Sequence, residues 1–154
     1  MQEECKEAAM SATGLEVFDK TLQSTHIWLN EIGETIGPDT QRCYHALRAV
    51  LFAVRDRLTT EEAFHLSAQL PMLVRGIFWD TYRPAGKPDR IRSREEFLRK
   101  VMEGIGDIGP ISPEDCTRAV FRVLDRHIPQ GEMADVKEML PEPVRSLFPN
   151  ERRS

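Results

Sequence analysis

Three side chains could bind a metal ion or take part in catalysis. Glu62 and His65 form a Glu-x-x-His motif within a predicted helix, so both side chains lie on one face of that helix. Di-iron and di-manganese helical bundles use this spacing twice, together with two inward-facing glutamates. His45 is a further candidate, because an imidazole that faces a groove can bind a metal ion or transfer a proton. A small-ligand or metal-binding domain with possible enzymatic activity is therefore one hypothesis for this protein.

The remaining sequence does not complete such a site. The segment that aligns with the Glu-x-x-His motif in the second half of the chain, Glu132 to Asp135, has no histidine. Cys43 and His45 would point about 200° apart on a helix, so they cannot act as a pair. The sequence offers neither a Ser-His-Asp arrangement nor a glycine-rich phosphate loop after a predicted strand. We therefore expect no cofactor, and a non-catalytic role is the first hypothesis.

Composition favours a folded, cytoplasmic protein. The chain has 154 residues, of which 40% are hydrophobic and 30% charged, and its three cysteines lack the CxxC spacing of metal or redox sites. The longest apolar run, Ala49 to Val54, is too short to cross a membrane. A net charge of −4 argues against nucleic acid as a partner. Such binding would need a local arginine face, for which the candidates are Arg48, Arg55, Arg57 and Arg75.

An internal repeat organises the chain. Moving the sequence by 70 residues matches two dipeptides and a tripeptide, and a shift of 69 matches the apolar residues upstream of them. The pairs are Arg48-Ala49-Val50 with Arg118-Ala119-Val120, Leu70-Pro71 with Leu140-Pro141, Val74-Arg75 with Val144-Arg145, and Trp28-Leu29 with Phe97-Leu98. Shared helical periodicity alone does not explain the paired Leu-Pro breaks. The sequence therefore predicts two copies of one structural unit.

Each copy is predicted to contain four helices, and no segment alternates as a strand would. The expected fold is all-α, with two pseudo-symmetric four-helix units packed as one domain. In the first unit, the second helix is predicted at about 40–58, the third from Thr59 to Leu70 and the fourth at about 72–79. In the second unit, the corresponding helices are predicted at about 113–127, from Glu132 to Leu140 and at about 143–148. The expected organisation is a flexible segment at 1–17, one domain at 18–148 (units at about 25–80 and 93–148, linker 81–92) and a tail at 149–154.

The repeat also sorts the candidate residues. Residues kept in both copies are interpreted as structural, because both copies need the same fold; they are Arg48, Arg118, Arg75, Arg145, Pro71 and Pro141. Trp79, Tyr82 and Arg83 occur in one copy only, and aromatic residues beside an arginine are typical of protein interfaces. A protein partner or a homodimer is therefore the expected binding mode. The alternative is that Trp79 and Tyr82 cover the seam between the copies.

Several of these segments together resemble the DUF2267 family, bacterial proteins of unknown function. The similar segments are THIWL at 25–29, YHALRAVLFAVRDRL at 44–58, AQLPMLVRGIF at 68–78, residues 79–84, Phe97-Leu98, and Gly131-Glu132 followed by Val136 and Leu140-Pro141. The resemblance extends from about Phe18 to Phe148. It implies a helical fold with two homologous halves, and it implies no activity.

Overall fold

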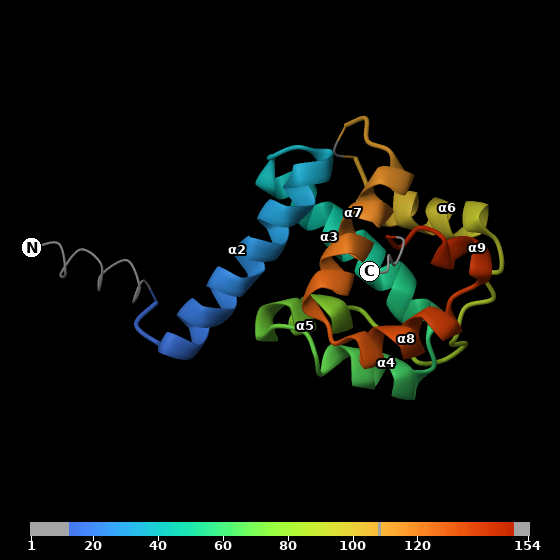
Figure 1. Cartoon of the computed structure of the whole chain (residues 1–154), viewed down its shortest axis with the longest axis horizontal. Coiled ribbons are helices and arrows are strands. Elements are labelled where there is room, and N and C mark those ends of the chain that lie inside the picture. The colour runs from blue at the N-terminus through green and yellow to red at the C-terminus, as the bar shows by residue number, and fades with distance from the viewer. Residues whose placement is uncertain (1–12, 108, 150–154) are drawn as a thin grey trace, which may run out of the picture.

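The computed structural model describes residues 13–107 and 109–149 of the chain. Within these residues it contains eight helices and no strand, which confirms the all-α fold class. The helices are α2 (Glu16–Ile36), α3 (Thr40–Arg57), α4 (Thr60–Ser67), α5 (Met72–Trp79), α6 (Arg94–Ile105), α7 (Pro113–His127), α8 (Gln130–Met139) and α9 (Glu142–Arg145) (Figure 1). None of them is both long and apolar enough to cross a membrane.

Side-chain caps set where several helices begin. Ser93 and Glu96 form a reciprocal capping box at the start of α6, in which Ser93 Oγ accepts from the Glu96 N–H and Glu96 accepts from the Ser93 N–H. Ser112 caps α7 and is followed by Pro113 at the first helical position. Both starts are readable from sequence because each cap acts within four residues.

The two Leu-Pro pairs separate short helices. Pro71 stands at the N-cap position of α5, and Pro141 stands at the N-cap position of α9. Leu70 and Leu140 are both buried, so each break is anchored in the core by the residue before the proline. A proline cannot continue a preceding helix, which explains why the chain turns at these points.

Helix α3 lies at the centre of the bundle and is buried from Ala49 to Leu51 and from Ala53 to Asp56. Helix α6 packs against α3, and α2 packs against α7, so the first helix of each predicted unit contacts the second helix of the other. A twofold relation between the units would produce this pairing, and the relation itself stays a prediction. The shared core includes the stacked rings of Phe121 and Phe148, with centroids 3.9 Å apart.

Helix α2 begins at Glu16, close to Gly14, near which the spacing of Phe18 and Leu22 predicts a helix start. The flexible segment expected at 1–17 stays a prediction, and residues 1–12 lie outside the described residues. Other boundaries differ from those expected. Helix α8 begins at Gln130 rather than Glu132, because Pro129 precedes it and fixes the entry of the chain. Helix α9 ends at Arg145, and residues 146–148 continue as turns into the core.

The first two turns of α2, residues 16–23, extend beyond the body of the bundle and are called the arm (Figure 1). Thr25, Trp28, Leu29 and Ile32 form the buried stripe of α2. Phe18 and Leu22 continue that stripe along the arm, at the helical spacing of one apolar face. The apolar face of α2 thus extends beyond the part of the helix that packs against the core.

Candidate functional site

The residues of the metal-binding hypothesis do not gather. Glu62 is half-buried in the first turn of α4, where its N–H donates to Thr59 Oγ1 at 3.1 Å. His65 is exposed on the same helix, and His45 lies on α3 with its ring edge-on to Tyr44. Across residues 13–107 and 109–149, no three His, Cys, Asp or Glu side chains are placed to hold a metal ion. The geometry therefore gives the Glu62–His65 motif no ligands from other helices.

Trp79 and Tyr82, the predicted binding residues, form an aromatic cluster with Phe64. The rings of Trp79 and Tyr82 meet edge to face with centroids 4.9 Å apart, and Phe64 lies 6.4 Å from Trp79. The Tyr82 hydroxyl is hydrogen-bonded to Thr60 Oγ1 at 2.8 Å, which ties the end of α5 to the start of α4. Trp79 and Tyr82 are half-buried, whereas Arg83 is exposed and Phe64 is 67% exposed. Trp79 and Tyr82 are thus partly covered by their neighbours, whereas the ring of Phe64 is open to solvent.

The paired arginines Arg75 and Arg145 make the same contact in the two halves of the chain. Arg75 Nη2 donates to the carbonyl oxygen of Leu70 at 3.0 Å, and Arg145 Nη2 donates to that of Leu140 at 3.1 Å. Arg75 Nε also donates to the carbonyl oxygen of Ser67. Each guanidinium therefore satisfies carbonyl groups left free at the end of the preceding helix.

The second pair, Arg48 and Arg118, is used differently in each half. Arg48 lies over the ring of Phe52, 4.5 Å from its centroid, and Nη2 is 3.5 Å from Asp80 Oδ2. Arg118 Nε is 3.0 Å from Oε2 of Glu114, one turn earlier on α7. Both contacts are at the surface, where an ion pair contributes little stability.

The sequence did not reveal an ion cluster in which the buried side chains of Arg55 and Asp56 meet the half-buried side chains of Asp89 and Lys100. Arg55 Nε donates to Asp56 Oδ1 at 2.7 Å, and Lys100 Nζ donates to Asp56 Oδ2 at 2.9 Å and also to Asp89. Burial alone would raise the pKa of Asp56, but the hydrogen bonds and charges of Arg55 and Lys100 outweigh it, so the pKa lies below its ordinary value. The cluster joins α3, the linker and α6.

Arg55 and Arg57 also hold the backbone around this cluster. Arg55 Nη1 donates to the carbonyl oxygens of Phe78 and Asp80, both at 2.9 Å, and its side chain is only 4% exposed. Arg57 Nε donates to the carbonyl oxygen of Ile91 at 2.9 Å. These arginines were candidates for a nucleic-acid-binding face, and both are instead engaged in intramolecular bonds.

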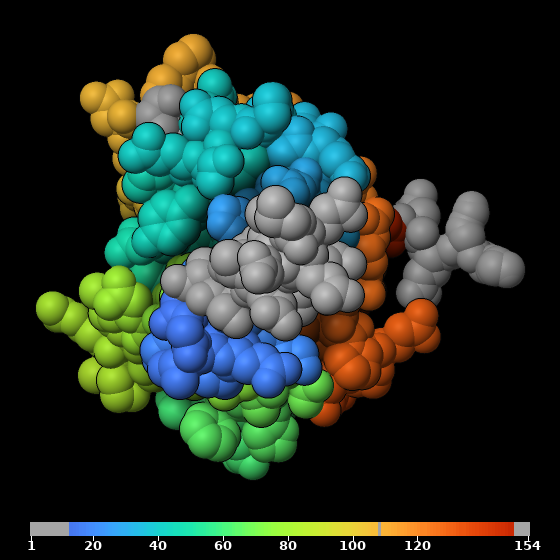
Figure 2. Space-filling model, turned by 90° about the vertical axis from the view of Figure 1, so that its left-hand side faces the viewer, coloured from blue at the N-terminus to red at the C-terminus, as the bar shows by residue number. Residues whose placement is uncertain are grey.

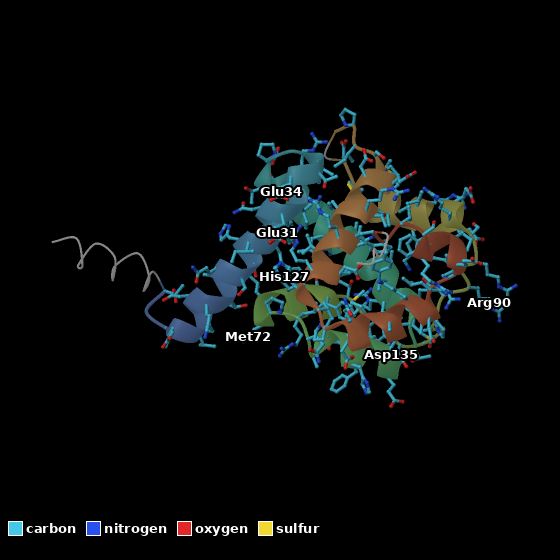
Figure 3. The ribbon with its side chains drawn as sticks, viewed as in Figure 1. Glu31, Glu34, Met72, Arg90, His127 and Asp135 are labelled. Atoms are coloured by element: carbon cyan, nitrogen blue, oxygen red, sulfur yellow. The ribbon has the colours of Figure 1, made fainter. Side chains whose placement is uncertain are left out.

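Six exposed apolar side chains lie on the arm, at the N-cap residue just before it, and on α5. Each of the six is between 39% and 55% exposed. We call this group the arm–α5 surface, and it consists of Leu15, Val17, Phe18, Leu22, Met72 and Leu73. Figure 2 shows the start of α2, in blue, next to the green segment that contains α5, and Figure 3 places Met72 beside the lower part of α2. Apolar surface of this extent is typical of an interaction site.

A groove of about 360 Å³ runs through this surface. Its lining is almost entirely apolar and is made by Thr13, Phe18, Thr21 and Leu22 from the α2 side and by Met72, Leu73 and Gly76 from α5. Gly76 leaves the groove open, because nothing lies within 4 Å of the position that a Cβ atom would take. A groove with these dimensions and this lining suits an apolar side chain or helix face rather than a polar metabolite.

Hydrogen bonds fix the two walls of the groove. Thr21 Oγ1 accepts from the N–H of Leu73 at 2.8 Å, so α2 caps the first turn of α5. At the start of the arm, Asp19 Oδ1 accepts from the N–H and the hydroxyl of Thr13. Binding to a groove that is already formed avoids the entropy cost of ordering it.

A second pocket, of about 400 Å³, lies on the other side of α2 and is lined in part by Trp28, Leu70 and His127. The His127 ring stacks on Trp28 with centroids 5.4 Å apart, and His127 Nε2 is 2.9 Å from Glu31 Oε1. Figure 3 shows Glu31 and His127 approaching each other from α2 and from the end of α7. Arg126 Nη1 also lies 3.3 Å from Glu31 Oε1, so these contacts hold α7 against α2.

The sequence contained a signal for the arm–α5 surface. Phe18, Leu22 and Leu29 recur at helical spacing, and residues 1–24 have no counterpart in the second half of the chain under the shifts of 69 and 70 residues. The predicted repeat therefore assigns no element of the second half to the first turns of α2. Met72 and Leu73 gave no such signal, because a short apolar helix is normally expected to be buried.

The fold and the surface define an all-helical protein with a preformed apolar groove, and the described part of the chain holds no group of three His, Cys, Asp or Glu residues placed to bind a metal ion. The family described as "Uncharacterized conserved protein (DUF2267)" matches residues 25–147 of the 154 residues. The chain belongs to this family. No curated protein sequence matches the chain. The family match begins at Thr25, so the arm precedes the region that the family shares.

Proposed function

We propose that this protein is a non-catalytic binding module that recognises another protein through its arm–α5 surface. The observation that carries the proposal is the preformed apolar groove between the arm and α5, whose walls are joined by the Thr21–Leu73 hydrogen bond. Large exposed apolar side chains in one continuous area are unfavourable in water unless a partner covers them. Trp79 and Phe64 extend the apolar area along α5 and onto α4.

Charge and shape favour a helical partner. Only Arg75 is charged among the residues of α5, so the floor of the groove offers apolar contact rather than ion pairing. An amphipathic helix places residues i, i+3, i+4 and i+7 on one face, and this face matches an elongated apolar groove. Leu22 and Leu73 from opposite walls would contact such a face directly.

Site-specific photo-crosslinking in the cells that make the protein tests this proposal. A benzophenone amino acid in place of Leu22 is expected to give discrete protein adducts, because that side chain lies in the groove. The matched control carries the same group in place of Ile27, which is 44% exposed on the same helix and lines the second pocket instead of the groove. A further variant with Leu73→Lys on the opposite wall should lose the adducts.

The result that would contradict the proposal is equally direct. If position 22 gives no adducts, or if positions 22 and 27 give the same adducts, the groove is not a protein-binding site. Persistence of the adducts in the Leu73→Lys variant would lead to the same conclusion, because a charged side chain would then stand in the binding groove without effect.

A further inference from the structure

We infer that the partner covering the arm–α5 surface is a second copy of this chain, paired about a twofold axis so that the arm of each copy lies against α5 of the other. This inference rests on the proposed function and specifies its partner. The structure offers three separate observations for it: the adjacency of a ridge and a groove, the apolar residues outside the groove, and the size of the exposed apolar area.

The arm and the groove are complementary parts of the same surface. The arm projects from the bundle (Figure 1). Phe18 and Leu22 make it an apolar ridge, and the groove lies directly beside it. In a twofold dimer the same surface patch of each copy contacts that patch of the other copy. The patch must therefore contain both a protruding part and a groove that receives it. Phe18 and Leu22 line the groove from the arm, and Met72 and Leu73 line it from α5, so both parts are present within one chain.

Leu15 and Val17 discriminate between a second copy and a single partner helix. Both are more than half exposed, and neither lines the groove. A helix lying in the groove alone would leave them in water. A second copy also brings its own arm alongside, so the apolar residues outside the groove become covered as well. The six side chains expose on the order of 500 Å² of apolar area in each copy.

The area agrees with a weak but specific dimer. Two such patches bury on the order of 1,000 Å² before the polar rim is included, which approaches the 1,200 Å² at the lower end of stable interfaces. The exposed rim of the arm carries one charge of each sign, on Glu16 and Lys20.

Sedimentation equilibrium of the full chain over about 1–200 µM is the test, with Leu22→Lys and Ile27→Lys as matched variants. Both variants place a lysine on the exposed surface of α2, but only Leu22 lines the groove. We expect a reversible dimer for the wild type and for Ile27→Lys. Leu22→Lys should weaken dimerisation by about 100-fold or more, because a charge would be buried in an apolar interface. Circular dichroism and thermal melting verify that both variants are folded.

Each outcome decides between the two proposals. A wild-type monomer at 200 µM would overturn the dimer, and groove adducts with a different protein would then still support the proposed function. A dimer that Leu22→Lys and Ile27→Lys weaken equally, or that neither weakens, would place the interface elsewhere and overturn this inference. The expected pattern is a dimer that only Leu22→Lys disrupts. This pattern supports both the proposed binding function of the groove and the pairing of two copies.

Discussion

Removal of the charge on Asp56 should reveal how much the ion cluster contributes to stability. Asp56 is 7% exposed, and its carboxylate accepts from Arg55 and from Lys100. In Asp56→Asn, Arg55 stays buried without its neighbouring negative charge, and the new amide group presents a donor to groups that are themselves donors. Breaking a buried pair from one side costs about 3–5 kcal/mol.

The structure places the expected value at the lower end of this range. In the variant, Arg55 keeps its hydrogen bonds to the carbonyl oxygens of Phe78 and Asp80, and Lys100 keeps its hydrogen bond to Asp89. We therefore expect Asp56→Asn to lower the free energy of unfolding by about 3 kcal/mol. Urea unfolding followed by circular dichroism should show a midpoint lower by about 1–2 M, given the usual urea dependence of small domains.

Asp125→Asn is the matched control. Asp125 pairs with Lys137 at 3.1 Å, but both side chains are more than one-fifth exposed. The loss in this control should be below about 1 kcal/mol, as for surface pairs in general. If both variants lower the free energy of unfolding by the same amount, burial does not increase the contribution of the Asp56 cluster to stability, and this explanation is refuted.

The pH dependence of the Asp56→Asn effect provides a second test. The pKa of Asp56 is lower in the folded protein than in the unfolded chain, so ionised Asp56 stabilises the fold above its ordinary pKa of about 3.9. This contribution is lost as the pH falls through the lower folded-state pKa. The difference between wild type and Asp56→Asn should thus be constant from pH 5 to 8 and shrink below pH 4. An unchanged difference at pH 3 would refute the electrostatic explanation.

Three further predictions concern packing, capping and thiol reactivity. Gly104→Ala should destabilise the protein by about 1 kcal/mol in urea titrations, because the new Cβ would lie 3.1 Å from the Ala49 Cβ. Gly131→Ala, whose Cβ would have no atom within 4 Å, should stabilise it by about 0.5 kcal/mol. Ser93→Ala removes the capping box and should lower the unfolding free energy by about 1 kcal/mol. Burial raises the pKa of the Cys116 thiol to about 11, so mass spectrometry should find Cys116 unmodified by thiol reagents at pH 8 until the protein unfolds.

The helices were predictable because their determinants are local. The Ser93 box, the Ser112 cap and the two Leu-Pro breaks each act within about one helical turn, and the sequence shows them directly. Helical periodicity also identified the buried stripe of α2. Helix ends depend on fewer contacts, which is why α8 and α9 begin one or two residues from the expected positions.

The ion cluster was not predictable, because its members come from distant segments. Arg55 and Asp56 are charged neighbours at the end of α3, and charged residues of this type are normally exposed. Their burial results from Lys100, which is 44 residues away, and from Asp89 in the linker. For the same reason Arg55 was a plausible member of an arginine face in the sequence, although its guanidinium lies in the interior.

The binding role predicted for Trp79, Tyr82 and Arg83 stays a prediction. In the structure Trp79 and Tyr82 are half-buried against each other, and the Tyr82 hydroxyl is bonded to Thr60. The exposed apolar side chains of the arm and of α5 were not among the predicted binding residues. Sequence periodicity can identify an apolar face, but whether another helix covers that face depends on tertiary packing.

Two ion pairs suggest how the halves of the chain select each other. Asp56 on α3 pairs with Lys100 on α6, and Glu31 on α2 pairs with Arg126 on α7. The shifts of 70 and 69 residues match Asp56 with Arg126 and Glu31 with Lys100, so in the predicted repeat the same two positions hold a pair with exchanged charges. If two first units packed together in this way, Glu31 would face Asp56, and two second units would bring Lys100 against Arg126. Both arrangements oppose like charges at partly buried positions, which is unfavourable. The exchanged charges therefore favour pairing of one unit with the other over pairing of identical units. A dimer formed through the arms is compatible with this preference, because it leaves the contacts between the units of each chain intact.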